Sequence, residues 1–202
     1  MSGVEKVTDL TSEKVLGYFE TVKSVFYVKM AMINWFYSGD VVKHRALSAA
    51  AAEMAGNFGD DFMQRGLNNI TEEVVENLKE DATTALIVSS WSVFEQIIKD
   101  LTVPDYSTHP SMLQADYHNG ILGYSQGERA EIGLFYHLRN AIVHYNGAFH
   151  AYRTVDITYA GTHFKSEGHF GEKIVVSPKL AMSICDDLQK YAMKAWSHLA
   201  RP

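Results

Sequence analysis

The spacing of apolar side chains between residues 11 and 37 is the feature that most constrains the fold. At about 100° per residue, seven of them fall on one side of a helix: Val15, Phe19, Val22, Phe26, Met30, Ile33 and Tyr37. Thr11 offers an N-cap hydroxyl with a carboxylate following it. The pattern therefore predicts a long amphipathic helix that ends before Ser38-Gly39-Asp40.

Similar signals predict further helices at about 41–67, 71–101, 128–145 and 177–199. The helix at 71–101 opens with TEEV, a cap followed by acids at the positive end of the helix dipole. Ser177-Pro178 starts the last helix, with proline where its missing N–H costs nothing. The helix at 71–101 should bury one stripe: Leu78, Ala82, Leu86, Trp91, Phe94, Ile98 and Leu101.

Before the last helix the period changes from helical to strand-like. RTVDITYA (153–160) alternates apolar and polar residues, and EKIVVS (172–177) is a short β-branched run. These two runs predict a β-hairpin at about 152–176. We therefore expect a mainly α protein, a helical bundle with a small β-hairpin inserted before the C-terminal helix. The chain should form one domain (1–202), in which 1–70 is an N-terminal helical extension of the core at 71–202.

Composition narrows the class of protein. With 47% hydrophobic and 21% charged residues, the 202-residue chain can bury a normal globular core. The net charge of −6 argues against an extended nucleic-acid-binding surface but allows a small basic site. The single cysteine, Cys185, excludes an intramolecular disulfide and suits a structural role. The polar first residues and the interruption of the most apolar stretch by Lys29 favour a cytoplasmic protein without a membrane segment.

Few residues are arranged for chemistry. The sequence has no glycine-rich phosphate loop, no paired-Cys zinc pattern and no Glu-x-x-His spacing. What remains is LRNAIVHYNG (138–147), which carries Arg139, Asn140 and His144 late in a predicted helix. Asn140 and His144 lie about 40° apart on that helix, and Arg139 flanks them about 140° from His144. A long arginine side chain can still bend toward the histidine.

This segment resembles the R-x4-6-H motif of the HEPN superfamily, in which a polar residue often follows the arginine near the end of a bundle helix. ALIVSSWSVFEQIIKDL (85–101) also resembles an earlier core helix of that family, with Glu95 at a commonly acidic position. The resemblance covers about residues 71–145 and extends to the last helix. The first seventy residues and the hairpin lie outside it.

The resemblance implies a metal-independent endoribonuclease that needs no cofactor. His144 would transfer protons, Arg139 would hold the scissile phosphate, and Asn140 would orient the histidine or contact phosphate. The ribose 2′-OH is the nucleophile, so the product is a 2′,3′-cyclic phosphate. Family members pair through the motif helix as homodimers and often act as toxins or in antiviral defence. RNA and an antitoxin or regulatory protein are the implied partners.

Supporting roles and alternatives stay open. Glu95 is a candidate partner for positioning Arg139, and Tyr145 or Tyr152 would either stack on a base or simply pack. In a purely structural reading, Arg139 pairs with an acid and His144 suits the negative end of the helix dipole. A non-catalytic HEPN-like module that binds a nucleotide or a protein is the alternative function. The histidines near the hairpin match no tight metal site and are expected at the surface: His150, His163 and His169.

Overall fold

The computed structural model describes residues 10–37, 49, 71–101, 122–145, 147–149, 154–167 and 173–199. These ranges contain helices α1 (Ser12–Tyr37), α4 (Glu72–Leu101), α5 (Gln126–His144) and α6 (Pro178–Leu199). Strands β1 (Thr154–Tyr159) and β2 (Thr162–Glu167) form one antiparallel sheet before α6. The expectation of a mainly helical fold with a small hairpin before the C-terminal helix is confirmed. The helix expected at 41–67 lies outside the described residues, apart from Ala49.

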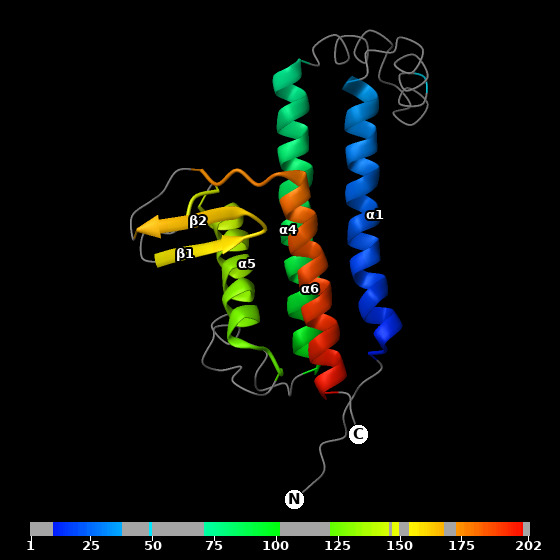
Figure 1. Ribbon diagram of the computed structural model, residues 1–202. Helices are drawn as coiled ribbons and strands as arrows, with labels where there is room; N and C mark the ends of the chain where they lie inside the picture. Colours follow the sequence, from blue (N-terminus) through cyan, green and yellow to red (C-terminus); the bar gives the residue numbers. More distant parts are fainter. Residues whose placement is uncertain are drawn as a thin grey trace, which may run out of the picture.

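Three long helices run side by side and form the body of the protein (Figure 1). α4 packs against both α1 and α6, and α1 also contacts α6. The apolar stripe expected on α1 faces this core, since Val15, Phe19, Phe26 and Ile33 are all buried. α5 and the hairpin lie on the opposite side from α1 (Figure 1).

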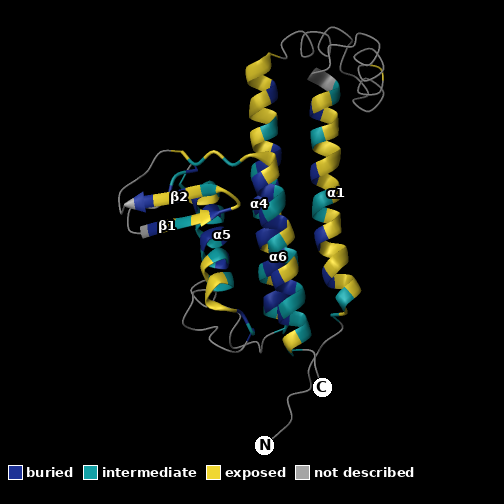
Figure 2. Cartoon of the chain, viewed as in Figure 1, coloured by how far each residue is buried: buried dark blue, intermediate teal, exposed yellow. Residues whose placement is uncertain are grey.

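The stripe expected on α4 is correct for five of its members, which are buried: Ala82, Leu86, Trp91, Phe94 and Ile98. Leu101 is half-buried and packs against the core. The expectation for Leu78 is wrong, because its side chain is 41% exposed. The first turns of α4 rise beyond the start of α6 and are largely exposed (Figure 2), and Leu78 lies near this end of a helix that begins at Glu72.

Side-chain caps explain where the helices begin. Thr11 Oγ1 accepts the backbone N–H of Lys14, and Thr71 Oγ1 accepts that of Val74. Ser177 Oγ accepts the N–H of Leu180, which places Pro178 at the first helical position as expected. α5 starts two residues earlier than expected, at Gln126, because a capping box links Ser125 and Glu128.

The second strand of the hairpin was placed wrongly by the sequence argument. β1 pairs with 162–167, not with EKIVVS at 172–177. The turn is the two-residue pair Ala160-Gly161, whose φ angles of 48° and 79° suit the right-handed twist of a tight hairpin. This local turn brings the nearest partner strand onto β1 before a distant segment can reach it. The inner face of the hairpin buries Val155, Tyr159, Phe164 and Ser166.

Candidate functional site

Helix α5 presents the R-x4-H motif on the side that faces away from the core. Leu138 and Ala141 are fully buried beneath it. Arg139 and Asn140 are half-buried, and His144 is exposed. The motif is therefore not sealed inside the protein. Val143, between Asn140 and His144 in sequence, is a large hydrophobic residue that remains 44% exposed.

The three motif side chains form one hydrogen-bonded group centred on Arg139. Arg139 Nη1 donates to Asn140 Oδ1 at 2.8 Å and lies 3.2 Å from His144 Nε2. A guanidinium has only donors, so a hydrogen bond at 3.2 Å requires His144 Nε2 to be the unprotonated nitrogen. The geometry thus corresponds to a neutral imidazole with its proton on Nδ1. Its Nε2 lone pair can accept a proton from a substrate hydroxyl once the guanidinium has moved away.

Arg139 also has one hydrogen-bond donor that is not used. Its Nε atom is buried and has no hydrogen-bond partner among the described residues. A buried donor without an acceptor costs about 1–3 kcal/mol. An anionic ligand that drew the guanidinium outward would remove this cost, so the side chain favours movement toward an acceptor.

The chain turns sharply just after the motif. The N–H groups of Tyr145 and Gly147 both donate to the carbonyl of Ala141, at 3.1 and 2.9 Å. Gly147 has φ +84°, in the left-handed region that glycine adopts without strain. The glycine expected to stop this helix does so and leaves His144 in the last helical position.

Tyr145 and Glu95 have different relations to the motif. Tyr145 is half-buried at the C-cap, with its ring centre 6.1 Å from that of His144. Glu95 lies on α4 and forms an ion pair with Lys99, with 3.4 Å between Lys99 Nζ and Glu95 Oε1. Across the described residues no hydrogen bond or ion pair joins Glu95 to Arg139. Lys99 is the nearer partner because it lies one helical turn away on the same helix.

The remaining candidates give no second site. His163 Nε2 lies 2.7 Å from Asp156 Oδ1 on the exposed face of the hairpin, as a surface histidine. His150, His169 and Tyr152 are outside the described residues. In the described ranges no three His, Cys, Asp or Glu side chains gather closely enough to hold a metal ion. Cys185 is buried, and this burial raises the pKa of its thiol.

The sequence argument overlooked one match to a known catalytic motif. GYSQG at 123–127 fits the G-x-S-x-G pattern of the hydrolase nucleophile elbow, in which a strained strand-to-helix turn exposes the serine. Ser125 instead has relaxed extended backbone angles (φ −69°, ψ 166°) and accepts the N–H of Glu128. The serine is a helix cap, and the geometry of an elbow is absent at this position.

A tyrosine–carboxylate cluster holds α5 and the hairpin against α6. Tyr159 donates to Asp187 Oδ2 at 2.7 Å, and Tyr191 donates to Glu131. Burial, together with the adjacent carboxylates, raises the pKa of both phenols, so they remain protonated donors. The T-shaped contact of Phe135 with Tyr159, at 4.9 Å, completes this anchor beneath the motif helix. Neither tyrosine was singled out in the sequence, because their partners lie 28 and 60 residues away.

Compared with models of known families, with curated proteins and with solved structures, the chain matches none. No helix in the described part of the chain is long and apolar enough to span a lipid bilayer. Any assignment of function therefore rests on the geometry of α5 and its surroundings.

Proposed function

We propose that the protein is a metal-independent endoribonuclease of the HEPN type. The observation that carries the proposal is the contact of Arg139 with both Asn140 and His144 on an accessible helix face. A cation, an orienting amide and a proton acceptor then meet in one place. RNA supplies its own nucleophile, so cleavage needs only proton transfer and charge stabilisation beyond substrate binding.

The proposed reaction is an internal transesterification. The substrate phosphate first draws Arg139 away from His144 Nε2. The freed lone pair of that nitrogen then takes the proton of the ribose 2′-OH, whose oxygen attacks the adjacent phosphorus. The bond from phosphorus to the 5′-oxygen breaks, and a protonated imidazole donates a proton to that leaving oxygen. Arg139 stabilises the negative charge that builds up on the phosphate oxygens in the transition state. The products are a 2′,3′-cyclic phosphate and a free 5′-OH.

A homodimer would supply both imidazoles. One neutral His144 can act as the base, but the acid must then be a second group. Two motif helices packed across a two-fold axis would bring two copies of His144 to one cleft. The exposed side chain of Val143 beside the motif supports such packing, because it offers apolar surface at the proposed seam. Two converging arginines would also make a local basic cleft on an acidic chain.

The test is cleavage of total RNA and tRNA by the purified protein in excess EDTA. His144→Ala and Arg139→Ala should each slow cutting and the formation of cyclic phosphate ends by about 10²–10³-fold while the dimer persists. Matched controls are His163→Ala and Arg129→Ala. His163 pairs with Asp156 on the hairpin, and Arg129 donates to the carbonyl of Tyr124 at the other end of α5. Cleavage that both motif substitutions leave undiminished would overturn the proposal.

The second candidate is a non-catalytic module that binds a nucleotide or a protein partner. The net charge of −6 favours this function. So do the contacts of Arg139 Nη1 with Asn140 and His144, because they engage this nitrogen within its own helix. A wild-type protein that is as inert as its variants, yet binds a nucleotide through Arg139, would select this function. A toxin or antiviral role, with RNA and an antitoxin as partners, belongs to the first proposal.

A further inference from the structure

The segment Lys173–Ser177 has a strand-like sequence but no strand partner among the described residues. β1 pairs with β2, so the β-branched run KIVVS leads into α6 unpaired (Figure 1). Its side chains alternate strictly: Lys173, Val175 and Ser177 are exposed, whereas Ile174 and Val176 are half-buried. Val175 is 84% exposed, more than any other large hydrophobic side chain in the described ranges. This period of two is that of extended chain lying on a surface.

One edge of this segment has unused hydrogen-bonding groups. The N–H of Ile174 donates to the carbonyl of Gly147 at 2.8 Å, and the carbonyl of Ser177 accepts the N–H of Ala181. In an extended chain, alternate residues direct their N–H and C=O groups to opposite edges. Those of Val175 therefore point away from Gly147, and no partner for them is recorded in the part of the chain that the structure describes. Such an open edge is a template for another strand.

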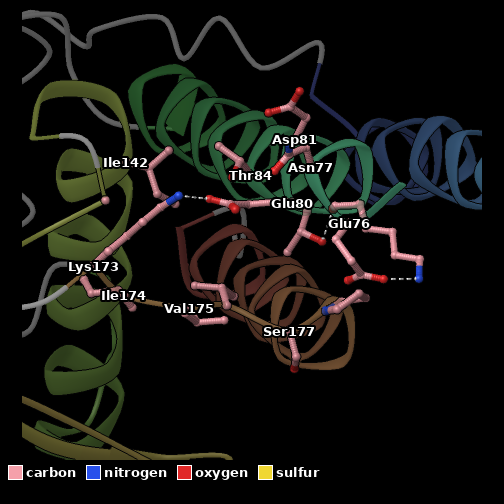
Figure 3. A pocket seen from close by; sticks show the side chains of 15 residues that line it. Glu76, Asn77, Glu80, Asp81, Thr84, Ile142, Lys173, Ile174, Val175 and Ser177 are labelled. Carbon is pink, nitrogen blue, oxygen red and sulfur yellow. Dashed lines mark hydrogen bonds and ion pairs between the residues drawn. The ribbon is translucent and has the colours of Figure 1, made fainter. Parts of the chain in front are cut away.

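A groove of about 470 Å³ runs between this segment and the first turns of α4 (Figure 3). Carboxylates, hydroxyls and apolar side chains share its lining, among them Glu76, Glu80, Asp81, Thr84, Ile142 and Val176. A groove between an extended edge and a helix is a geometry that accepts a peptide as an added strand. Its volume is within the usual range of ligand sites, about 300–1,000 Å³.

The charges along the groove select the kind of peptide. Lys79 Nζ lies 2.7 Å from Glu76 Oε1, and Lys173 pairs with Glu80, so both cations are already partnered (Figure 3). Asp81 is exposed, and no ion pair or hydrogen bond of its carboxylate is recorded among the described residues. The lining thus contains three carboxylates and two ammonium groups. Because both carboxylates and Lys173 are more than half exposed, these pairs are weak and can exchange partners at small cost.

We propose that the edge of Lys173–Ser177 and the adjoining groove bind an extended basic peptide by strand addition. The peptide backbone pairs with the N–H and C=O of Val175, and its β-branched side chains cover Val175. Its lysine or arginine side chains meet Asp81 and exchange with the cations on Glu76 and Glu80. The proposal does not depend on RNA cleavage.

The test uses a fluorescein-labelled hexapeptide of alternating valine and lysine, titrated with the full-length protein by fluorescence anisotropy. The hexapeptide with glutamate in place of lysine is the charge control. We expect the lysine peptide to bind at least tenfold more tightly at low salt. Val175→Pro removes one backbone donor and should weaken binding at least tenfold, whereas Val175→Thr keeps the donor and should bind like the wild type. Asp81→Asn should weaken the lysine peptide several-fold and leave the glutamate peptide unchanged.

A measurement on the wild type guards against misfolding of the proline variant. The amide proton of Val175 should shift and gain protection from exchange when the lysine peptide is added. Equal binding of both peptides, or an unaffected Val175 amide, would overturn the proposal. Dimerisation without peptide that Val175→Pro abolishes would assign the edge to a second copy of the chain, which also overturns it.

Discussion

Arg139 and His144 are in direct contact, with 3.2 Å between Arg139 Nη1 and His144 Nε2, although they lie about 140° apart around α5. The arginine bends across Asn140, whose amide oxygen accepts from the same nitrogen at 2.8 Å. The three side chains therefore form one unit, and changes to them should not act independently.

Arg139→Ala and His144→Ala should each lower the rate of RNA cleavage by about 10²–10³-fold, because each removes a group that acts in the transition state. The double variant should be hardly slower than either single variant, since members of one catalytic unit are not additive. Single-turnover rates on one purified RNA measure this. Multiplied effects in the double variant would show that the two residues act separately.

The imidazole tautomer is a second prediction. In the folded protein, the neutral His144 ring should carry its proton on Nδ1, because Nε2 accepts from Arg139. ¹⁵N-resolved NMR of the histidine side chains distinguishes the two nitrogens. Arg139→Ala should shift His144 toward a mixture of tautomers. A wild-type ring protonated on Nε2 would contradict the contact.

Low pH should lower the free energy of unfolding, because Glu128 then becomes protonated. Burial alone would raise the pKa of this carboxyl, but hydrogen bonds from Lys194 and Ser125 outweigh burial and lower it below the ordinary 4.5. A lowered pKa gives stability that is present above pH 4.5 and is lost as the pH falls through the folded-state value. Urea unfolding between pH 3 and pH 7 should therefore show a flatter acid limb for Glu128→Gln than for the wild type. Parallel acid limbs would refute the assignment.

Ser125 distinguishes a cap from a nucleophile. Ser125→Ala should lower the free energy of unfolding by about 1 kcal/mol, because the N–H of Glu128 loses its acceptor. Ser125→Asn, which keeps a good capping residue, should recover most of that loss. Thermal melts of both variants provide the measurement. Unchanged stability in Ser125→Ala would mean that the serine does not cap α5.

Gly147→Ala should destabilise the exit from the motif helix. The residue would have to adopt φ +84°, and its Cβ would lie 3.1 Å from Cγ of Lys173. The lysine side chain can move, so backbone strain of about 1–2 kcal/mol is the main effect. Chemical denaturation measures it. Ala148→Gly, one residue on, is the control for a change in backbone freedom at this turn.

Most of the local structure was predictable from the sequence. Helix-period spacing and capping residues placed α1, α4, α5 and α6 within two residues of their observed ends. The same arguments put Arg139, Asn140 and His144 on one helix that ends before Gly147. These features depend on contacts within a few residues, where spacing alone decides which side chains are neighbours.

Only the tertiary structure decided what pairs across long distances. EKIVVS and THFKSE compete for β1, and the tight turn at Ala160-Gly161 selects the second. Leu78 fits the buried stripe of α4 by its spacing, yet it lies near the exposed start of that helix and is itself 41% exposed. Glu95 pairs with Lys99 and not with Arg139, whose reach to His144 depends on its side-chain conformation. Local periodicity specifies which face of a helix or strand is apolar. Which other element covers that face depends on how separate elements pack, and short-range sequence patterns do not contain this information.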